Sequence, residues 1–352
     1  MAYIAGLMII DAPASALNNA GSEEGARTDN TIGVKKIDRQ TPYVSAQAFR
    51  HWLRIAAAEQ PGWVAARVGR ESKIAYTDAD PIKNWDDDLF GYMRAPSKRA
   101  DVEQAKDMSP LEKDREITRV SPLRVSTLVA VGPSVIVDDF GTMTRQDGDP
   151  VPHEHQFYRA HLQGLLSLDL TSAGTFYDME RTGFKNMDSN RRDAAKAAGC
   201  EEGTIRGQKA WRLPSAVRRE RVATLLDALA TVGGGAKMAL HYTDITPAVM
   251  MLAVVKHGNN PFYRTFVADS GKLQTQFHRP AFDELMAVHG ESFLSDIHIG
   301  WAQGFLGEQR QKMSEAVEAN PLRPRIKTGH PVEIIRQLAG AIRGGDSSRW
   351  FD

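Results

Sequence analysis

The sequence contains one cysteine, Cys200, among 352 residues. A single thiol excludes an internal disulfide and every metal site built from paired Cys-x-x-Cys motifs. Such sparse cysteine usage is typical of the reducing cytoplasm, where we expect this protein to reside.

The sequence also lacks an apolar run of the roughly 20 residues that a membrane span requires. The run Ala248–Val255 is far too short. The first residues are apolar and precede Ala14–Ala16, a pattern that resembles a signal-peptide cleavage site. No positive charge precedes that run, however, and Asp11 interrupts it. We therefore predict a buried first strand over Tyr3–Ile10 and no membrane partner.

An excess of one charge is missing too, because 44 Lys and Arg residues balance 44 Asp and Glu residues. Zero net charge argues against a protein that coats nucleic acid over its whole surface. One basic segment stands out between residues 181 and 221, where basic residues outnumber acidic ones. It is a candidate polyanion contact, although such segments are usually solvated faces. Its basic residues are Arg181, Lys185, Arg191, Arg192, Lys196, Arg206, Lys209, Arg212, Arg218, Arg219 and Arg221.

The most informative segment that is present is Tyr43–Pro61. Ser45 has the residue type of a helix N-cap. After it, Phe49, Leu53 and Ala56 recur at helical spacing and predict one buried face. The polar face carries Gln47, Arg50 and Arg54. It could bind phosphate and sugar oxygens, or it could simply face solvent beside a loop.

Strand-like and helical segments alternate along the rest of the chain. Their order, strand, helix, strand and again strand, helix, strand, predicts an α+β domain of ferredoxin or RNA-recognition type with long insertions. We expect strands at 120–137, 166–170, 237–242, 245–255 and 295–301, helices at 190–198, 279–288, 307–319, 331–343 and from Pro214 to the glycines at 233–235, and loops at 12–36 and 141–155.

Two groups of residues could bind a metal ion. Asp138 and Asp139 follow a strand, and their carboxylates could hold Mg²⁺ for phosphodiester hydrolysis. Strand-end aspartates are common in turns, however, and we expect Asp86–Asp88 to form a solvated turn. His153 and His155 would suit a metal on a strand, but the proline beside them favours a loop. We therefore predict no catalytic residue, no metal and no cofactor.

Four motifs follow one another in the first half of the chain: SALNNAGSEEGARTDNTIGVKKI, YVSAQAFRHWLR, DDDLFGYM and RVSPLRVSTLVAVG. Together they resemble the CRISPR-associated autoregulator family of DevR type, the Cas-seven backbone subunit of type I-B and related Cascade complexes. The resemblance implies one hand-shaped domain over residues 1–352. Its palm would be RNA-recognition-like, with a finger insertion at 78–118 and a thumb insertion at 172–214. Both insertions are polar, and we expect little structure in either when the chain is alone.

The resemblance also implies a set of RNA-binding residues. A backbone subunit must accept any guide sequence, so its contacts should go to phosphate and ribose. In the thumb, Phe184 and Met187 would act as apolar wedges. The full set is Asn18, Asn19, Lys35 and Lys36 in the loop, Ser45, Gln47, Arg50 and Arg54 on the helix, Ser121, Arg124 and Ser126 on the palm, and Arg181, Phe184, Lys185 and Met187 in the thumb.

The implied function is non-catalytic. Copies of the chain would assemble head to tail along a CRISPR RNA, contact other Cascade subunits and present the guide to a target DNA strand. Two alternatives stay open. One is a metal-dependent ribonuclease backbone subunit of type III kind that uses Asp138 and Asp139. The other is a DNA-binding regulator, which the historical name of the family suggests.

Overall fold

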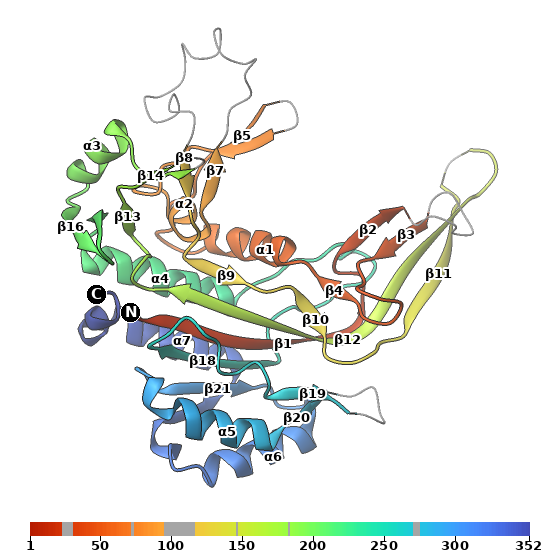
Figure 1. The fold of residues 1–352 in the computed structure, drawn as a ribbon. Helices are drawn as coiled ribbons and strands as arrows, with labels where there is room; N and C mark the ends of the chain where they lie inside the picture. The colour runs from red at the N-terminus through yellow and green to blue at the C-terminus, as the bar shows by residue number, and fades with distance from the viewer. Residues whose placement is uncertain (23–30, 72–73, 95–116, 146, 182–183, 270–274) are drawn as a thin grey trace.

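A computed structural model describes residues 1–22, 31–71, 74–94, 117–145, 147–181, 184–269 and 275–352. One large mixed sheet dominates this part of the chain (Figure 1). Part of the predicted finger, residues 95–116, lies outside the described residues. The sheet contains β1 (Tyr3–Ser15), β2 (Asn19–Ser22), β3 (Thr31–Val34), β4 (Tyr43–Val44), β9 (Leu123–Val125), β10 (Leu128–Ala130), β11 (Ile136–Met143), β12 (Val151–Asp169), β18 (Val249–Val255), β21 (Ile297–Trp301) and β22 (Ile326–Gly329).

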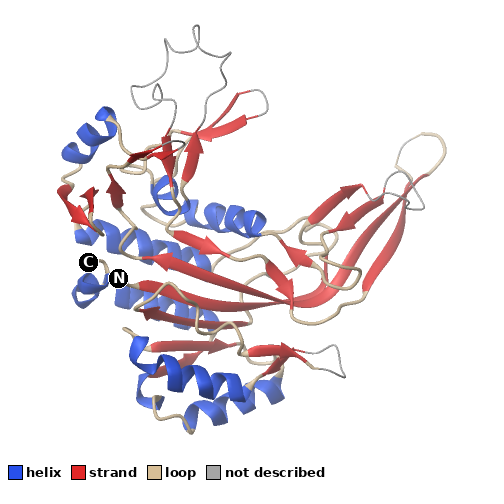
Figure 2. Cartoon of the chain, viewed as in Figure 1, coloured by secondary structure: helices blue, strands red, loops and turns tan. Residues whose placement is uncertain are grey.

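Helices and small sheets surround the large sheet (Figure 2). The helices are α1 (Ala46–Ala58), α2 (Trp85–Phe90), α3 (Ser189–Ala197), α4 (Ser215–Ala230), α5 (Arg279–His289), α6 (Gly307–Glu318) and α7 (Pro331–Arg343), with 3₁₀ turns at Gly290–Ser292, Arg323–Arg325 and Gly345–Trp350. The small sheets pair β5 (Val68–Glu71) with β6 (Ile74–Thr77), β7 (Tyr92–Arg94) with β8 (Ile117–Arg119), β14 (Glu180–Arg181) with β15 (Phe184–Lys185) and β19 (Phe266–Ala268) with β20 (Thr275–Phe277), and join β13 (Thr175–Tyr177), β17 (Gln208–Arg212) and β16 (Glu201–Ile205).

The central strand β1 is buried on both faces. Ile4, Met8 and Ile10 pack into the core that α1, α4 and α7 cover. Leu7 and Ile9 pack into a second core with α5 and α6 on the other side. Two covered faces explain why the strand reads as a continuous apolar run, and they confirm the predicted buried first strand. Among the described helices, none is long and apolar enough to cross a membrane.

An arm of strands projects beyond the helices (Figures 1 and 2). It consists of β2, β3, β11 and the first half of β12. β11 pairs with β12 in a register that sets Ile136 opposite Tyr158 and Met143 opposite Val151. The loop predicted over 141–155 is therefore wrong at both ends, because strands extend to Met143 and begin again at Val151. Most of the described part of the loop predicted over 12–36 also lies in strands. Strands without a helix layer bury little, so the arm shows little of the apolar alternation that predicts a strand.

The helix predictions are confirmed more closely than those for strands. All five, and the segment after Ser45, form helices within a few residues of the expected bounds. The strand predicted over 237–242 is wrong, because this segment forms turns. The preceding glycine loop packs tightly instead: a Cβ on Gly234, whose φ is +147°, would lie 2.4 Å from Trp52 Cγ of α1. The close approach that Gly234 permits is thus to α1.

The prediction of a solvated turn at Asp86–Asp88 is wrong, because all three side chains are buried on α2. Asp88 Oδ1 lies 2.5 Å from Arg119 Nη2, and Asp88 Oδ2 lies 2.8 Å from Arg221 Nη1. Arg119 and Arg221 come from β8 and α4, far away in sequence. Buried charges need such partners, and local composition did not indicate which residues would supply them.

Burial changes the titration of Asp87, because it raises the pKa of this carboxyl to about 6 from an ordinary value of 3.8. The folded state thus binds more protons than the unfolded state between these values, so stability falls as the pH rises from about 4 to about 6. We expect Asp87→Asn to remove this fall, because an amide does not titrate. We expect no gain in stability, because both carboxylate oxygens accept hydrogen bonds and the amide keeps only one acceptor oxygen. Urea unfolding across this pH range measures it, with exposed Asp193→Asn as control. Parallel pH profiles for Asp87→Asn and the wild type would contradict the assignment.

The predicted thumb segment, 172–214, is more structured than its composition suggested. Phe176, Met187, Trp211 and Leu213 form a small separate core, to which Ile82 contributes from outside the segment. The basic segment is also largely engaged in internal contacts. Its residues Arg191, Arg218 and Arg221 are buried and donate to backbone carbonyls or aspartates.

Candidate nucleic-acid interface

The predicted loop residues gather at the N-terminus of α1. Ser45 caps the helix and accepts a hydrogen bond from the Ala48 backbone N–H at 3.3 Å. Asn18 Oδ1 in turn accepts from the Ser45 backbone N–H at 3.0 Å, and Asn18 O accepts from the Lys35 backbone N–H at 2.9 Å. The neighbouring predicted residues are Asn19 at the start of β2, Lys36, whose Nζ donates to Gln156, and exposed Gln47.

Arg50 is used inside the protein. Its guanidinium donates to the carbonyls of Leu123 and Phe90, each at 2.6 Å, and lies 3.3 Å from Ser121 Oγ. Burial, and then the charge of Arg54, lowers the pKa of Arg50. The Arg50 side chain therefore joins α1 to the segment around β9. This internal role competes with the predicted contact between Arg50 and a guide. Arg54 is half-buried and stacks 4.6 Å from the centre of the Phe90 ring.

A groove of about 270 Å³ lies between β9, a strand of the predicted palm, and the predicted thumb segment. Ser121 and Arg124 line it from the palm side, and Arg181 and Phe184 line it from the thumb side. The Arg181 guanidinium stacks 5.4 Å from the centre of the Phe184 ring. Four predicted residues from two distant parts of the sequence thus meet at one site. We name this site the palm–thumb groove.

Arg206 is a groove residue that sequence reasoning did not single out. Its two terminal nitrogens each lie 2.9 Å from an oxygen of Asp169, which fixes the guanidinium at the rim. Its only sequence signal was membership of the basic segment.

Other predicted residues lie away from the groove. Met187 is 1% exposed in the thumb core, so its side chain is not available as a wedge in this conformation. Ser126 Oγ accepts from the Leu165 backbone N–H at 2.8 Å and lines a separate cavity. Lys185 is half-buried on β15, paired with Glu180.

Arg124 points to the face of the sheet opposite α1. Leu123 points into the core that α1 covers. Successive strand residues alternate between faces, so Arg124 points to the other one. The predicted set is therefore divided into an α1 group and a groove group, which Arg50 connects through Ser121.

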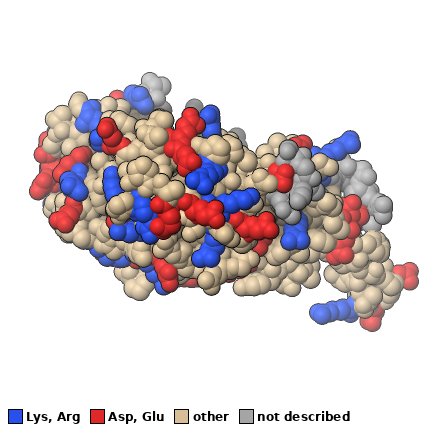
Figure 3. Space-filling model, turned by 90° about the horizontal axis from the view of Figure 1, so that it is seen from below, with Lys and Arg blue, Asp and Glu red and all other residues tan. Residues whose placement is uncertain are grey.

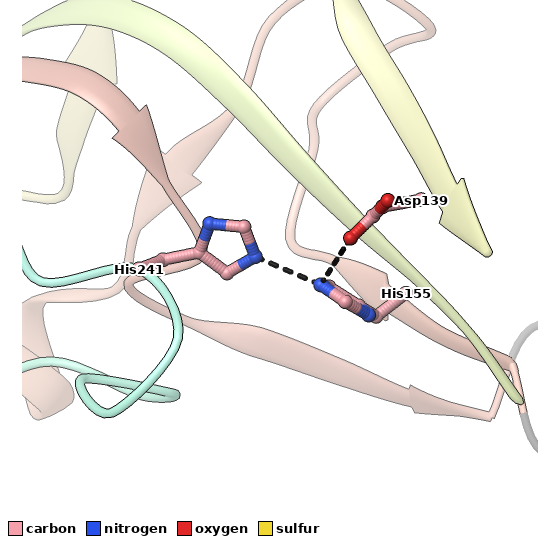
Figure 4. Close-up of side chains that lie close together, drawn as sticks. All are labelled: Asp139, His155 and His241. Atoms are coloured by element: carbon pink, nitrogen blue, oxygen red, sulfur yellow. Dashed lines mark hydrogen bonds and ion pairs between the residues drawn. The ribbon is translucent and has the colours of Figure 1, made fainter. Parts of the chain in front are cut away.

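A cluster of ionisable side chains forms at the arm (Figure 4). Asp139 of β11 and His155 of β12 are paired in register, and His241 comes from the turns after α4. His155 Nε2 lies 2.8 Å from His241 Nε2 and 3.3 Å from Asp139 Oδ2. We name these three residues the His–Asp cluster. Since His153 and His155 lie in β12, the prediction of a loop pair is wrong.

The surroundings of His155 disfavour its charged form. Burial, and then the positive charge of Lys237, lowers the pKa of this imidazole, whereas Asp139 opposes the shift. Its Nδ1 is buried and has no hydrogen-bond partner among the described residues. A proton on Nδ1 has no acceptor there, either in the charged imidazolium or in the neutral tautomer whose Nε2 lone pair is free.

Asp138 and Asp139 point to opposite faces of β11. Asp138 Oδ1 accepts from Gln156 Nε2 at 3.0 Å, whereas Asp139 faces His155. Alternation along a strand forbids both carboxylates from binding the same ion. The idea that the pair jointly holds Mg²⁺ is therefore wrong. Asp139 by itself lies beside His155 and His241.

No family model and no curated protein sequence matches this chain. A chain named "CRISPR RNA-guided surveillance complex" is similar in structure, with a TM-score of 0.50, 12% identity and coverage of 96% of this chain and 99% of that chain. A second, named "CRISPR RNA-guided surveillance complex, pre-nicking", has a TM-score of 0.52, 12% identity and coverage of 97% and 100%. The chain resembles surveillance-complex chains in fold. At 12% identity the comparison shows a shared fold alone, and the similarity extends over essentially the whole length of each chain.

Proposed function

We propose that this chain is a non-catalytic, CRISPR RNA-binding backbone subunit of a Cascade complex, of type I and similar to type I-B. Two independent lines support the proposal. The four sequence motifs occur in the order of the DevR family, and the chain shares its fold with surveillance-complex chains over its full length.

The observation that carries the RNA-binding role is the palm–thumb groove. Arg124 and Arg181 bring two positive charges to its two sides, and Phe184, which stacks with Arg181, adds an apolar surface on the thumb side. Cations that line a groove can neutralise phosphates without reading base edges. Such contacts suit a subunit that must bind every guide sequence alike.

The connectivity of the central elements supports an RNA-recognition-like palm. Along the chain they run β1, α1, the β9 and β10 segment, β12, α4 and β18. In space, β9 and β10 flank β12, which pairs antiparallel with β1, which pairs antiparallel with β18. This β-α-β-β-α-β order is the one expected of a ferredoxin-like domain.

In this role the protein has several partners. Copies of the chain follow one another head to tail along the guide, because only a heterologous interface builds an open array. Other Cascade subunits bind the ends of the array, and a target DNA strand pairs with the displayed guide in the cytoplasm. The finger and thumb are the elements that we assign to neighbour contact and guide kinking.

Purification without nuclease treatment tests the proposal. We expect RNA of uniform length to co-purify, to raise the ratio of absorbance at 260 nm to that at 280 nm, and to place the protein in assemblies larger than a monomer. A parallel nuclease-treated sample should elute as smaller species. Protein that carries no RNA in either sample, although CRISPR RNA is co-expressed, would overturn the proposal.

The same preparation distinguishes the two rival functions. Cleavage of added RNA in Mg²⁺ that is lost in Asp139→Asn would favour the ribonuclease, because Asp139 is the aspartate that lies beside His155 and His241. Sequence-specific binding of duplex DNA that survives moderate salt would favour the regulator.

A further inference from the structure

We propose that the His–Asp cluster binds one divalent cation of the zinc class. Two imidazole nitrogens and a carboxylate oxygen, from β11, β12 and the turns after α4, lie within 4.8 Å of one another (Figure 4). Nitrogen and oxygen atoms in this combination are ligands that Zn²⁺ prefers. The proposal is independent of the RNA-binding role.

The geometry is close to that of a loaded centre. Bonds of about 2.0–2.1 Å to a tetrahedral Zn²⁺ place two ligand atoms roughly 3.3 Å apart. His155 Nε2 is 3.3 Å from Asp139 Oδ2 and 2.8 Å from His241 Nε2. The third pair, His241 and Asp139, has its ligand atoms within 4.8 Å, so loading the site requires the His241 side chain to shift.

The chemistry of the cluster also calls for a cation. Two Nε2 atoms that lie 2.8 Å apart cannot both carry a proton, so at least one of them presents a bare lone pair. The carboxylate of Asp139 adds a further acceptor. A single proton serves one acceptor well, whereas a divalent cation satisfies all three groups together.

Each ligand is held by its surroundings. His155 is buried in β12, and its side chain is 6% exposed. The His241 ring stacks on Phe157 with centroids 5.0 Å apart, and its backbone N–H donates to Lys237 O at 2.9 Å. The side chain of Asp139 is 52% exposed, so the fourth coordination position opens to solvent. A bound cation would fasten the arm to the turns after α4.

Lys237 gives the proposal a distinctive signature. Its positive charge acts on both His155 and Asp139. It therefore opposes a cation in the cluster, and neutralising it should strengthen metal binding. Adventitious binding elsewhere on the surface would not respond in this way.

Titration of dialysed, RNA-free protein with Co²⁺ tests the site through the visible d–d absorption of a tetrahedral centre, with Zn²⁺ as competitor and elemental analysis for stoichiometry. We expect one ion per chain. His241→Gln and Asp139→Asn should each weaken binding at least about tenfold, Lys237→Gln should tighten it, and exposed His257→Gln should match the wild type. Circular dichroism checks that each variant is folded. The proposal would be overturned by the absence of a tetrahedral band in the wild type, or by a wild-type affinity for the metal in both His241→Gln and Asp139→Asn.

Discussion

Replacing Asp88 by alanine is expected to lower the free energy of unfolding by about 3–5 kcal/mol, the usual effect of breaking a buried ion pair. Asp88 is fully buried and contacts both Arg119 and Arg221. Without its carboxylate, two buried guanidinium groups lose their counter-charge. They keep only backbone carbonyl acceptors such as Thr175 O and Ile82 O.

Chemical denaturation of the purified variant measures this loss. Asp88→Asn is expected to cost less than Asp88→Ala, because the amide oxygen still accepts hydrogen bonds. Asp88 also accepts from the Gly174 backbone N–H at 3.0 Å. Faster amide exchange around residues 172–177 should therefore accompany the loss. Exposed Asp193→Ala serves as control. A loss of less than about 1 kcal/mol for Asp88→Ala would show that the carbonyl acceptors suffice.

Removing both groove cations, with Arg124→Gln and Arg181→Gln together, is expected to weaken RNA binding equally for unrelated guide sequences. Each phosphate contact on a single strand contributes roughly 0.7 to the slope of log affinity against log salt. Two lost contacts should therefore lower the slope by about 1.4. Because Arg124 and Arg181 lie at the surface of the groove, the double variant should fold normally.

Fluorescence anisotropy with two RNAs of different sequence, at several salt concentrations, measures this effect. The control pair is Arg310→Gln with Lys312→Gln on α6, because basic and acidic side chains are interspersed over the face formed by α5 and α6 (Figure 3). The pair Gln47→Ala with Arg54→Gln tests the α1 group separately. An unchanged affinity and slope in the groove variant would remove the groove from the guide site.

Local patterns account for the elements that were predicted well. Ser45 as N-cap, the buried face with Phe49 and Leu53, and the helix Pro331–Arg343 all depend on residues within a few turns of one another. Helix signals are local in this sense, because capping and 3.6-residue periodicity lie within one segment. The arm was missed because its strands have no helix layer and so show little apolar alternation, although β11 and β12 pair locally, down to Met143 with Val151.

Charge was the property that sequence alone described least well. Arg191, Arg218 and Arg221 counted toward a basic surface, yet all three are buried. Arg191 has a local partner in Asp188, but the other acceptors come from elsewhere: Ala79 O for Arg191, Ala173 O for Arg218, and Asp88 for Arg221. A count of charges in a window cannot include acceptors that the fold brings from 45 to more than 130 residues away.

The sequence by itself determined the helices, the doubly buried first strand and the motifs that resemble a CRISPR backbone subunit, because these depend on residue order within short segments. Only the tertiary structure decided which polar side chains remain available. It turned Arg50 and the aspartates of Asp86–Asp88 inward. It also placed Arg124 and Arg181 on two sides of one groove, and joined Asp139, His155 and His241 at the arm. The physical reason is that burying a polar group requires partners, and the fold chooses those partners from the whole chain.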